Sequence, residues 1–266
     1  MAAIGLAAAA GVVWWEYPTA AADTTAEDDL PVPPVPPRIT EGENYDKCLA
    51  MVVPDPSGAL VFAENWAGDG GGDGAMHCQA LADVELGDVD QGAELLDQVG
   101  TTSTAAPAAR AAIYGQAGQS WMMAGNPQRA YDSADKALAL NPDEPDLLVD
   151  RAIAGNALDH FQQAADDLTK ALDADPSRGD ALVLRAASYR HLDQLDLAED
   201  DVERALSLDP DDPDALLEHG ILRQRRGDPA AARKDWERAI ALAPDSETAD
   251  LAQQNLALLD AGPERR

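Results

Sequence analysis

The strongest constraint on the fold is a regular spacing that recurs along the second half of the chain. Four segments share an alanine, a following aliphatic residue and a closing proline, and they are Ala137–Pro142, Ala171–Pro176, Ala205–Pro210 and Ala239–Pro244. Their closing prolines are equally spaced along the chain. A period of about 34 residues indicates a repeated supersecondary unit that buries its apolar face against its neighbours.

Giving each proline position 32 sets four repeats at residues 111–144, 145–178, 179–212 and 213–246. Small residues then fill three positions in every repeat. They are Gly118, Ala152, Ala186 and Gly220 at position 8, Ala130, Ala164, Ala198 and Ala232 at position 20, and Ala137, Ala171, Ala205 and Ala239 at position 27. Small side chains at these positions allow two helices of one hairpin to approach closely, where a larger side chain would clash.

This register resembles the tetratricopeptide repeat, a helix-turn-helix unit of about 34 residues. The resemblance implies an all-α fold, a right-handed α-solenoid of antiparallel helix hairpins. The chain departs from the family pattern at position 7, where the usual leucine is replaced by Ala117, Arg151, Arg185 and His219.

Local signals mark the ends of the predicted helices. Gly125–Pro127 and Gly227–Pro229 predict turns between the two helices of the first and fourth repeats. The residues after the closing prolines are the expected N-caps of the next helices, and they are Asp143, Ser177, Asp211 and Asp245.

Residues 247–266 are predicted to form a capping helix and a tail. The amphipathic segment Glu247–Leu259 follows the last repeat directly. Its apolar residues, Leu251, Leu256, Ala257 and Leu259, are expected to cover the exposed end of the stack.

Residues 44–110 carry a decayed form of the pattern and predict two degenerate helical hairpins. Leu86–Leu96 looks like the turn and second helix of one further repeat, and the offset from Gly87 to Gly125 is longer than the period of the later repeats. We therefore expect a four-residue insertion within Thr101–Pro107. An earlier hairpin is expected from helices at 45–53 and 56–66, followed by a flexible glycine-rich linker at 68–74.

The amino-terminal segment suggests export. Ala2–Trp15 is uncharged and apolar, too short for a comfortable membrane span but about right for a signal-peptide core. Residues 1–22 are therefore expected to be a signal peptide or a short N-terminal anchor, and a helix with no targeting role stays open. Residues 23–43 are acidic and proline-rich and predict a disordered linker, extended in polyproline II over Pro31–Pro37, with a docking site for a proline-reading domain as the alternative. We expect a periplasmic or otherwise exported protein.

Cys48 and Cys78 are the only cysteines in the chain. An even number of cysteines behind a secretory-looking start suggests one disulfide. If both upstream hairpins form, the two residues sit on the first helices of neighbouring units, where a bond would hold the weakest repeats together. Two buried reduced cysteines remain the alternative.

Composition excludes several classes of function. The chain has 49 acidic and 19 basic residues and a net charge of −30, which repels nucleic acids and anionic membrane surfaces. A mean hydropathy of −0.30 excludes a multi-span membrane protein. The histidines are scattered, and no catalytic, cofactor-binding or metal-binding arrangement stands at a defined spacing, so we expect no enzyme and no cofactor.

In the resembled family, the first helices line a concave groove that binds an extended or helical peptide. The candidate groove residues here are Gln116, Gln119, Met122, Met123, Val149, Ile153, Leu158, Val183, Arg190, His191, Leu217, Ile221 and Arg225. The lysine and asparagine clamp that co-chaperones of the family use for a terminal carboxylate is missing, since position 2 is Ala112, Asp146, Asp180 or Asp214. An apolar partner segment with acidic neighbours near the arginines is expected. The alternatives are core packing for the two methionines and a solvated face for the arginines.

The predicted function is a non-catalytic scaffold or adaptor of the cell envelope that binds a partner peptide or helix in this groove. Its high charge is compatible with a monomer. The first alternative is a chaperone for a secreted client such as an apocytochrome, which differs from a passive scaffold in requiring a retained anchor. An enzyme is the remote alternative.

Overall fold

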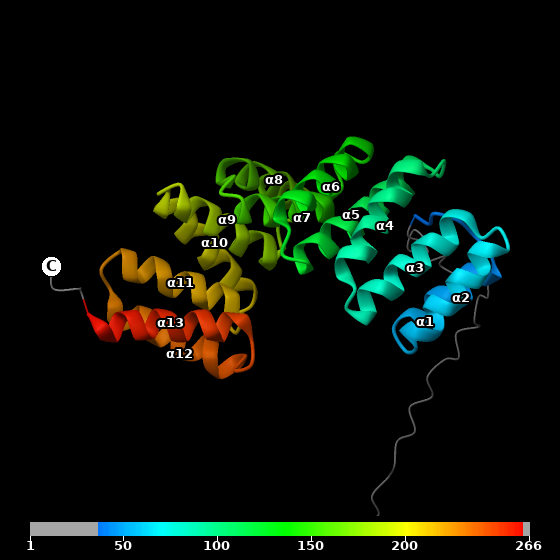
Figure 1. The fold of residues 1–266 in the computed structure, drawn as a ribbon. Helices are drawn as coiled ribbons and strands as arrows, with labels where there is room; N and C mark the ends of the chain where they lie inside the picture. The colour runs from blue at the N-terminus through cyan, green and yellow to red at the C-terminus, as the bar shows by residue number, and fades with distance from the viewer. Residues whose placement is uncertain (1–36, 263–266) are drawn as a thin grey trace, which may run out of the picture. The chain divides into compact units, whose positions relative to one another are not determined.

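The computed structural model describes residues 37–262, which contain thirteen α-helices and no strand (Figure 1). The helices are α1 Glu43–Val52, α2 Pro56–Gly68, α3 Gly72–Leu86, α4 Val89–Thr102, α5 Pro107–Met123, α6 Pro127–Leu140, α7 Pro145–Ala157, α8 Phe161–Ala174, α9 Gly179–His191, α10 Leu195–Leu208, α11 Pro213–Arg225, α12 Pro229–Leu242 and α13 Glu247–Ala261. The predicted all-α fold is confirmed. The expected leader, most of the expected linker and the last four residues lie outside the described range.

Helix pairs recur with the period of the sequence. The first helices α7, α9 and α11 begin at Pro145, Gly179 and Pro213, at the spacing of the closing prolines. The two helices of each pair pack on each other, and α5, α7, α9 and α11 also contact one another in succession. Each hairpin therefore buries its apolar side against the next, as expected of a repeat array.

The alanines of positions 20 and 27 lie where the helices approach closest, and each is at most 1% exposed. The glycines of position 8 are required by the same contact. A Cβ atom at Gly118 would lie 3.3 Å from the carbonyl oxygen of Ala130, and one at Gly220 would lie 2.3 Å from Nε1 of Trp236. The small-residue pattern therefore sets the distance between the helices of each hairpin.

The N-caps lie one residue later than predicted. They are Glu144, Arg178, Asp212 and Ser246, and only the side chains of Asp212 and Ser246 accept a hydrogen bond from the helix backbone. The predicted caps Ser177 and Asp211 instead belong to the preceding turn, where their backbone N–H groups donate to the carboxylates of Asp175 and Asp209. The later start is common to all four helices, and in two of the turns an aspartate before the closing proline bonds the residue that was predicted as the cap.

Left-handed residues close the turns inside the hairpins. Gly125 and Gly227 have φ of 71° and 86°, as the sequence signals predicted. In the second and third repeats the same place is taken by Asp159 and Asp193, with φ of 63° and 59°. Aspartate tolerates this conformation better than most residues, so these two turns form without glycine.

Position 7, where the chain departs from the resembled family, carries buried ion pairs. The Arg151 guanidinium donates to both carboxylate oxygens of Asp167 at 2.7 and 2.8 Å, and Arg185 donates to both oxygens of Asp201 at 2.7 Å. Both carboxylates are buried. The arginines also reach back to position 25 of the preceding repeat, Asp135 and Thr169. The result is a ladder that joins both helices of one repeat to the repeat before it.

The fourth repeat has a histidine in this ladder. Nδ1 of His219 lies 3.4 Å from a carboxylate oxygen of Asp235, to which Arg223 donates at 2.8 Å. Burial lowers the pKa of His219, and the nearby charge of Arg223 lowers that pKa further. Burial raises the pKa of Asp235. Arg223 thus supplies the positive charge that arginine at position 7 supplies in the second and third repeats.

The amino-terminal hairpins are helical from Glu43 onward, and the glycine run between them is not a flexible linker. Only Asp69–Gly71 forms a turn, and α3 begins at Gly72. A Cβ atom at Gly74 would lie 2.6 Å from Cγ2 of Thr40 and 2.8 Å from the ring of Trp66. The glycines therefore allow α3 to pack tightly against α2, and the expectation of a linker at 68–74 is wrong.

The four-residue insertion also lies elsewhere than expected. The loop between α4 and α5 spans 103–106, the same length as the loop at 141–144 between α6 and α7. Helix α5 has 17 residues, whereas α7, α9 and α11 have 13 each. The insertion is therefore an extra first turn of α5, residues 107–110.

Cys48 of α1 and Cys78 of α3 are joined by a disulfide, with their Cα atoms 6.1 Å apart. Both residues are fully buried, in a cluster with Val52, Ala59 and Ala63. The bond connects the first helices of two neighbouring hairpins. Its presence in the isolated protein stays a prediction.

Helix α13 packs on the last repeat with two of the four residues expected to do so, Leu256 and Leu259. Ala249 and Ala252 are fully buried, and Leu256 and Leu259 pack around Ala252 and Trp236. Leu251, by contrast, is 42% exposed, and Ala257 is exposed as well. The helix starts at its N-cap Ser246, whose side chain accepts a hydrogen bond from the backbone N–H of Ala249.

None of the helices within residues 37–262 is both long enough and apolar enough to cross a membrane. Within the same range, no group of three or more His, Cys, Asp or Glu side chains is arranged to hold a metal ion.

The ion-pair ladder gives a prediction for stability. Replacing Asp201 by asparagine should lower the free energy of unfolding by about 3 kcal/mol, because Arg185 then lies buried without its charge partner. Urea denaturation followed by circular dichroism measures this change. Asp200→Asn removes the same charge from an exposed neighbour and should change the free energy by less than about 0.5 kcal/mol. Similar values for the two variants would contradict the proposed role of the ladder.

The disulfide gives a second prediction. Mass spectrometry of protein isolated without reductant, with free thiols blocked at lysis, should recover the peptides of Cys48 and Cys78 linked to each other. Closing this loop should contribute about 3.5 kcal/mol in the chain-entropy model, so reduction should lower the denaturation midpoint. Complete labelling of both thiols in the native sample would refute the bond and weaken the argument for export.

Candidate partner-binding face

The candidate site is the side of the repeat array formed by the first helices, and we call it the first-helix face. It comprises positions 2, 5, 6, 9, 12 and 13 of α5, α7, α9 and α11. Of the predicted groove residues, Gln119, Met123, His191 and Arg225 are exposed, Val149 is buried, and the others are half-buried. Leu158 does not belong to the face, because α7 ends at Ala157 and Leu158 is its C-cap.

The apolar residues of the face are partly used by the core. Met122 packs against the cluster around Trp121, and Ile153 and Val183 pack against the cluster around Leu148 and Leu182. Met123 is 67% exposed. Of the two adjacent methionines, Met123 is therefore the one that offers most of its side chain to a partner.

The predicted basic end of the face is paired within the chain. Nε of Arg190 donates to Glu218 at 2.5 Å, and Arg225 donates to the Arg190 carbonyl oxygen at 2.8 Å and to Asp193 at 3.0 Å. The His191 ring stacks on Phe161 with the ring centroids 4.2 Å apart. These arginines therefore face carboxylates of their own chain, which weakens the expectation that they attract acidic residues of a partner.

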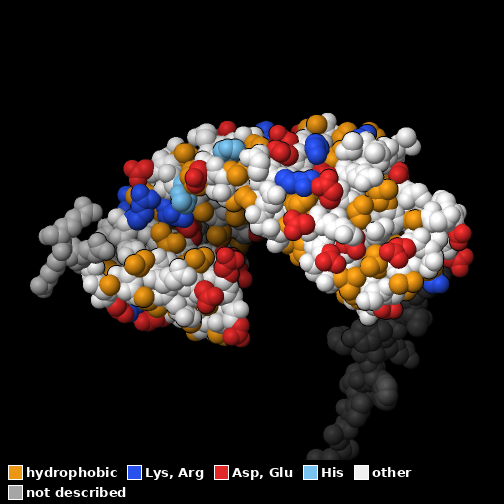
Figure 2. All heavy atoms as spheres, in the orientation of Figure 1, with side chains coloured by type: hydrophobic (Ala, Val, Ile, Leu, Met, Phe, Trp, Pro, Cys, Tyr) orange, Lys and Arg blue, Asp and Glu red, His pale blue; other side chains and the backbone are white. Residues whose placement is uncertain are grey.

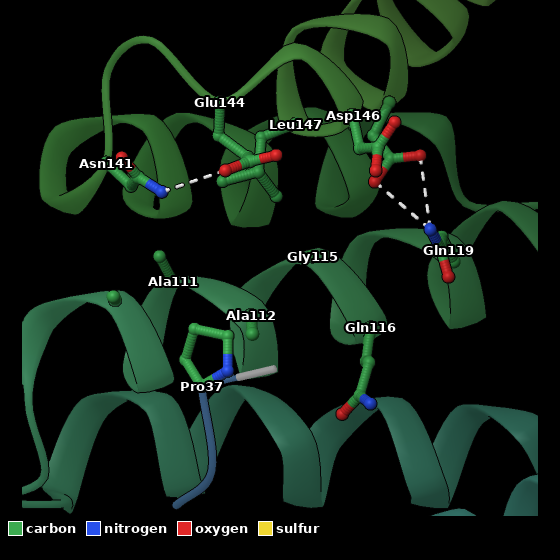
Figure 3. A pocket seen from close by; sticks show the side chains of 12 residues that line it. Pro37, Ala111, Ala112, Gly115, Gln116, Gln119, Asn141, Glu144, Asp146 and Leu147 are labelled. Carbon is green, nitrogen blue, oxygen red and sulfur yellow. Dashed lines mark hydrogen bonds between the residues drawn. The ribbon is translucent and has the colours of Figure 1, made fainter. Parts of the chain in front are cut away.

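A pocket of about 300 Å³ lies between α5 and α7 on the first-helix face (Figure 3). It is lined by Pro37, Ala108, Ala111, Ala112, Gly115, Gln116, Gln119, Asn141, Glu144, Asp146, Leu147 and Asp150. Of these, Gln116 and Gln119 were predicted as site residues, and Asp150 stands at groove position 6 of the same register. The pocket thus joins predicted groove positions to the loop that precedes α7.

Small residues create the apolar floor of this pocket. Ala108 belongs to the extra first turn of α5, and Ala111 and Ala112 follow it on the same helix. A Cβ atom at Gly115 would lie 2.8 Å from Cδ2 of Leu147, so glycine is needed where α5 and α7 come together. The space exists because α5 is longer than the other first helices and carries no large side chain there.

Polar groups surround the floor, as the dashed lines in Figure 3 indicate in part. Nε2 of Gln119 donates to both carboxylate oxygens of Asp150 at 3.2 and 3.3 Å. Asp146 accepts from Arg178 at 2.6 Å. Burial raises the pKa of Asp150 to about 6; the hydrogen bond from Gln119 and the nearby charge of Arg178 offset part of this rise, and the charge of Asp146 adds to it. Asp150 is thus an acid whose charge is only partly compensated and to which no cation within residues 37–262 is bonded.

A buried histidine holds Gln116 at the edge of the pocket. Tyr45 of α1 and Gln116 of α5 bond the two ring nitrogens of His77 at 2.6 and 2.7 Å. Burial lowers the pKa of His77, so the neutral ring accepts from the tyrosine hydroxyl and donates to the amide oxygen. This chain of hydrogen bonds connects the two amino-terminal hairpins, which the Cys48–Cys78 disulfide joins, to the candidate site.

The register places Asp150 on the first-helix face, but the sequence carries only a weak signal that Asp146 and Asp150 line a pocket. Asp146 and Asp150 are four residues apart on one helix and share a face, but the same is true of many acidic pairs in this chain. The signal that stands out is the combination of three alanines and Gly115 along one side of α5 with acids at positions 2 and 6 of the following repeat.

The raised pKa of Asp150 gives a pH-dependent prediction. Because the pKa is about 6 in the folded state and 3.8 ordinarily, the ionised carboxylate costs stability above pH 6, and this cost fades as the pH falls toward 4. Asp150→Asn should therefore raise the free energy of unfolding by about 2 kcal/mol at pH 7.5 and by clearly less at pH 4. Urea denaturation at both pH values measures the difference. Destabilisation at pH 7.5 would show that the charge of Asp150 is well compensated.

Comparison with known proteins agrees with this geometry. The family model described as tetratricopeptide repeat matches residues 119–188 and 187–257. Similar solved structures include MamA from Desulfovibrio magneticus RS-1, with 19% identity over 63% of this chain and 93% of that chain and a TM-score of 0.54. YrrB, titled a TPR protein with an unusual peptide-binding site, has 18% identity over 68% of this chain and 91% of that chain, with a TM-score of 0.51.

The Cut9–Hcn1 structure of the APC/C has 19% identity and a TM-score of 0.60; the match covers 80% of this chain and 42% of that one. No curated protein matches the chain. These likenesses confirm the solenoid fold. Because the matched repeats together span more than half of its 266 residues, the chain belongs to the tetratricopeptide repeat family.

Proposed function

We propose that the protein is a non-catalytic scaffold that binds a segment of a partner protein on its first-helix face. Proteins of this family mediate binding to proteins or peptides through surfaces built from successive repeats. The observation that carries the proposal is the pocket between α5 and α7, which opens on this face among the predicted groove positions. Met123 and the half-buried Ile153, Val183 and Ile221 extend the face along the array.

The position of the pocket favours an extended segment over a globular surface. Side chains of an extended segment leave its backbone singly and can enter a narrow pocket one at a time, whereas a flat protein surface would pass over it. The pocket lies at one end of the face, and the half-buried aliphatic residues of α7, α9 and α11 follow along it. A segment bound in this way would place one side chain in the pocket and rest its apolar residues on the later repeats.

We further propose that this scaffold works in the cell envelope. Support comes from the apolar stretch Ala2–Trp15 and from the buried Cys48–Cys78 pair, since disulfides persist in oxidising compartments. Cell fractionation with an antibody to the native protein checks this, and a protein found only in the cytosolic fraction contradicts it.

The binding proposal predicts the effect of a face variant. Met123→Asp with Ala112→Gln places a charge on the exposed methionine site and fills the pocket. Leu197→Asp with Ala231→Gln makes the same chemical changes on the second helices α10 and α12, where Leu197 is 46% exposed. The substitution at the exposed site, Met123→Asp in one variant and Leu197→Asp in the other, should change the free energy of unfolding by only about 0.5 kcal/mol. Circular dichroism of both variants should match that of the wild type.

Pull-down from whole-cell extract, with recovered proteins identified by mass spectrometry, should give the same partner with the wild type and the second-helix variant and lose it with the face variant. Equal recovery by all three proteins would move the site away from the first-helix face. Arg225→Glu is a poorer test of the face, because Arg225 donates hydrogen bonds to Asp193 and to the Arg190 carbonyl oxygen. Its loss would disturb the fold as well as the face.

A further inference from the structure

We propose that the pocket between α5 and α7 receives a lysine or arginine side chain of the bound segment, so that the partner is a cationic peptide. This inference rests on the proposed function and adds the chemistry of the ligand to it. It is opposite in charge to the acidic-neighbour partner expected from the arginines of the face.

The shape of the pocket suits a long side chain with an apolar stem. Its floor consists of Ala108, Ala111, Ala112 and Gly115, which offer methyl and methylene contacts but no hydrogen-bonding side chain. Polar groups stand on the α7 side, where Glu144, Asp146 and Asp150 line the same space. Lysine and arginine bury their methylene groups along apolar surface while the charged end reaches polar groups, and this division matches the lining.

The charge of the pocket is one-sided. Its twelve lining residues include three carboxylates and no lysine, arginine or histidine. Arg178, the cation that bonds Asp146 from outside the lining, also bonds Asp180 at 2.8 Å. Asp150 receives hydrogen bonds from the neutral amide of Gln119. An entering ammonium or guanidinium group would bond this carboxylate directly, which the more distant Arg178 does not do.

Three buried acids elsewhere in the chain are each bonded by an arginine, whereas the buried Asp83 accepts, within the described part of the chain, only from the amide of Gln91. Asp167 and Asp201 each accept two hydrogen bonds from an arginine of their own repeat, and Glu218 accepts one from Arg190. Among the described residues, no cation bonds Asp150 directly; the charge of Arg178 lowers the pKa of Asp150 from nearby, but the hydrogen bonds of Arg178 go to Asp146 and Asp180. A cation supplied by the partner completes the same kind of pair from outside.

An anionic or purely apolar occupant fits less well. An acidic side chain would lie beside three carboxylates in a protein of net charge −30, and like charges brought together disfavour binding. An apolar side chain would remove water from Asp150 without replacing it. Acidic side chains are scattered over the side of the molecule drawn in Figure 2, and the net charge of −30 gives a field around the protein that favours the approach of cations.

The test uses three synthetic peptide libraries that differ at one residue. Each peptide has seven residues, with alanine, valine, leucine and serine randomised around a central lysine, norleucine or glutamate, and a fluorescent label for anisotropy. Norleucine keeps the apolar stem of lysine without the charge. The proteins are the full chain, Asp150→Asn, and Asp166→Asn as the matched control. Asp166 is an exposed carboxylate on α8 that also accepts a hydrogen bond from a glutamine, Gln162, at 3.0 Å.

The wild type and Asp166→Asn should bind the lysine library about tenfold more tightly than the norleucine library, and the glutamate library most weakly. Asp150→Asn should reduce the preference for lysine to about twofold or less. Raising the salt concentration from 50 to 300 mM should weaken binding of the lysine library alone.

Equal binding of lysine and norleucine, a preference for glutamate, or a preference for lysine that survives in Asp150→Asn would overturn the inference. Failure of all three libraries to bind would overturn it as well. The proposed function has its own criterion. If the Met123→Asp, Ala112→Gln variant loses its cellular partner while the libraries show no preference for lysine, the face binds peptides but does not select cations.

Discussion

The close approach of the two helices in each hairpin is the constraint on which the rest of the structure depends. Alanine at positions 20 and 27 and glycine or alanine at position 8 leave no room for adjustment, as the contact between Gly220 and Trp236 illustrates. Once this distance is fixed, the remaining side chains of a helix can reach only particular partners. The arginines of position 7 meet the aspartates of position 23, and the first helices of successive repeats come into contact.

Much of the fold could be predicted because its determinants are local and repeated. The closing prolines, the small residues and the glycine turns mark helices that the structure reproduces within a few residues. The errors arose where a signal has two structural meanings. The glycines of 68–74 serve close helix packing rather than flexibility, and the residues after the prolines belong to turns held by aspartates such as Asp175 and Asp209.

The site was less predictable, because its chemistry depends on which charges are already satisfied. The register identified the first-helix face, and Gln116 and Gln119 do line the pocket. Sequence position alone assigned Arg190 and Arg225 to a partner, whereas the fold brings Glu218 and Asp193 to them. Asp150 shows the reverse case, an acid bonded within the described residues only by a neutral amide, which becomes evident only when its neighbours are placed in three dimensions.

The extra turn of α5 has a consequence for how any ligand is aligned. A uniform array presents the same contacts once in every repeat, so a bound chain could shift by one repeat and lose little. Residues 107–110 make one repeat unlike the others and give the pocket Ala108 as part of its floor. A ligand anchored there has a single register and a defined direction along the face. Four additional residues in one helix thus give an otherwise periodic surface one position that differs from all the others.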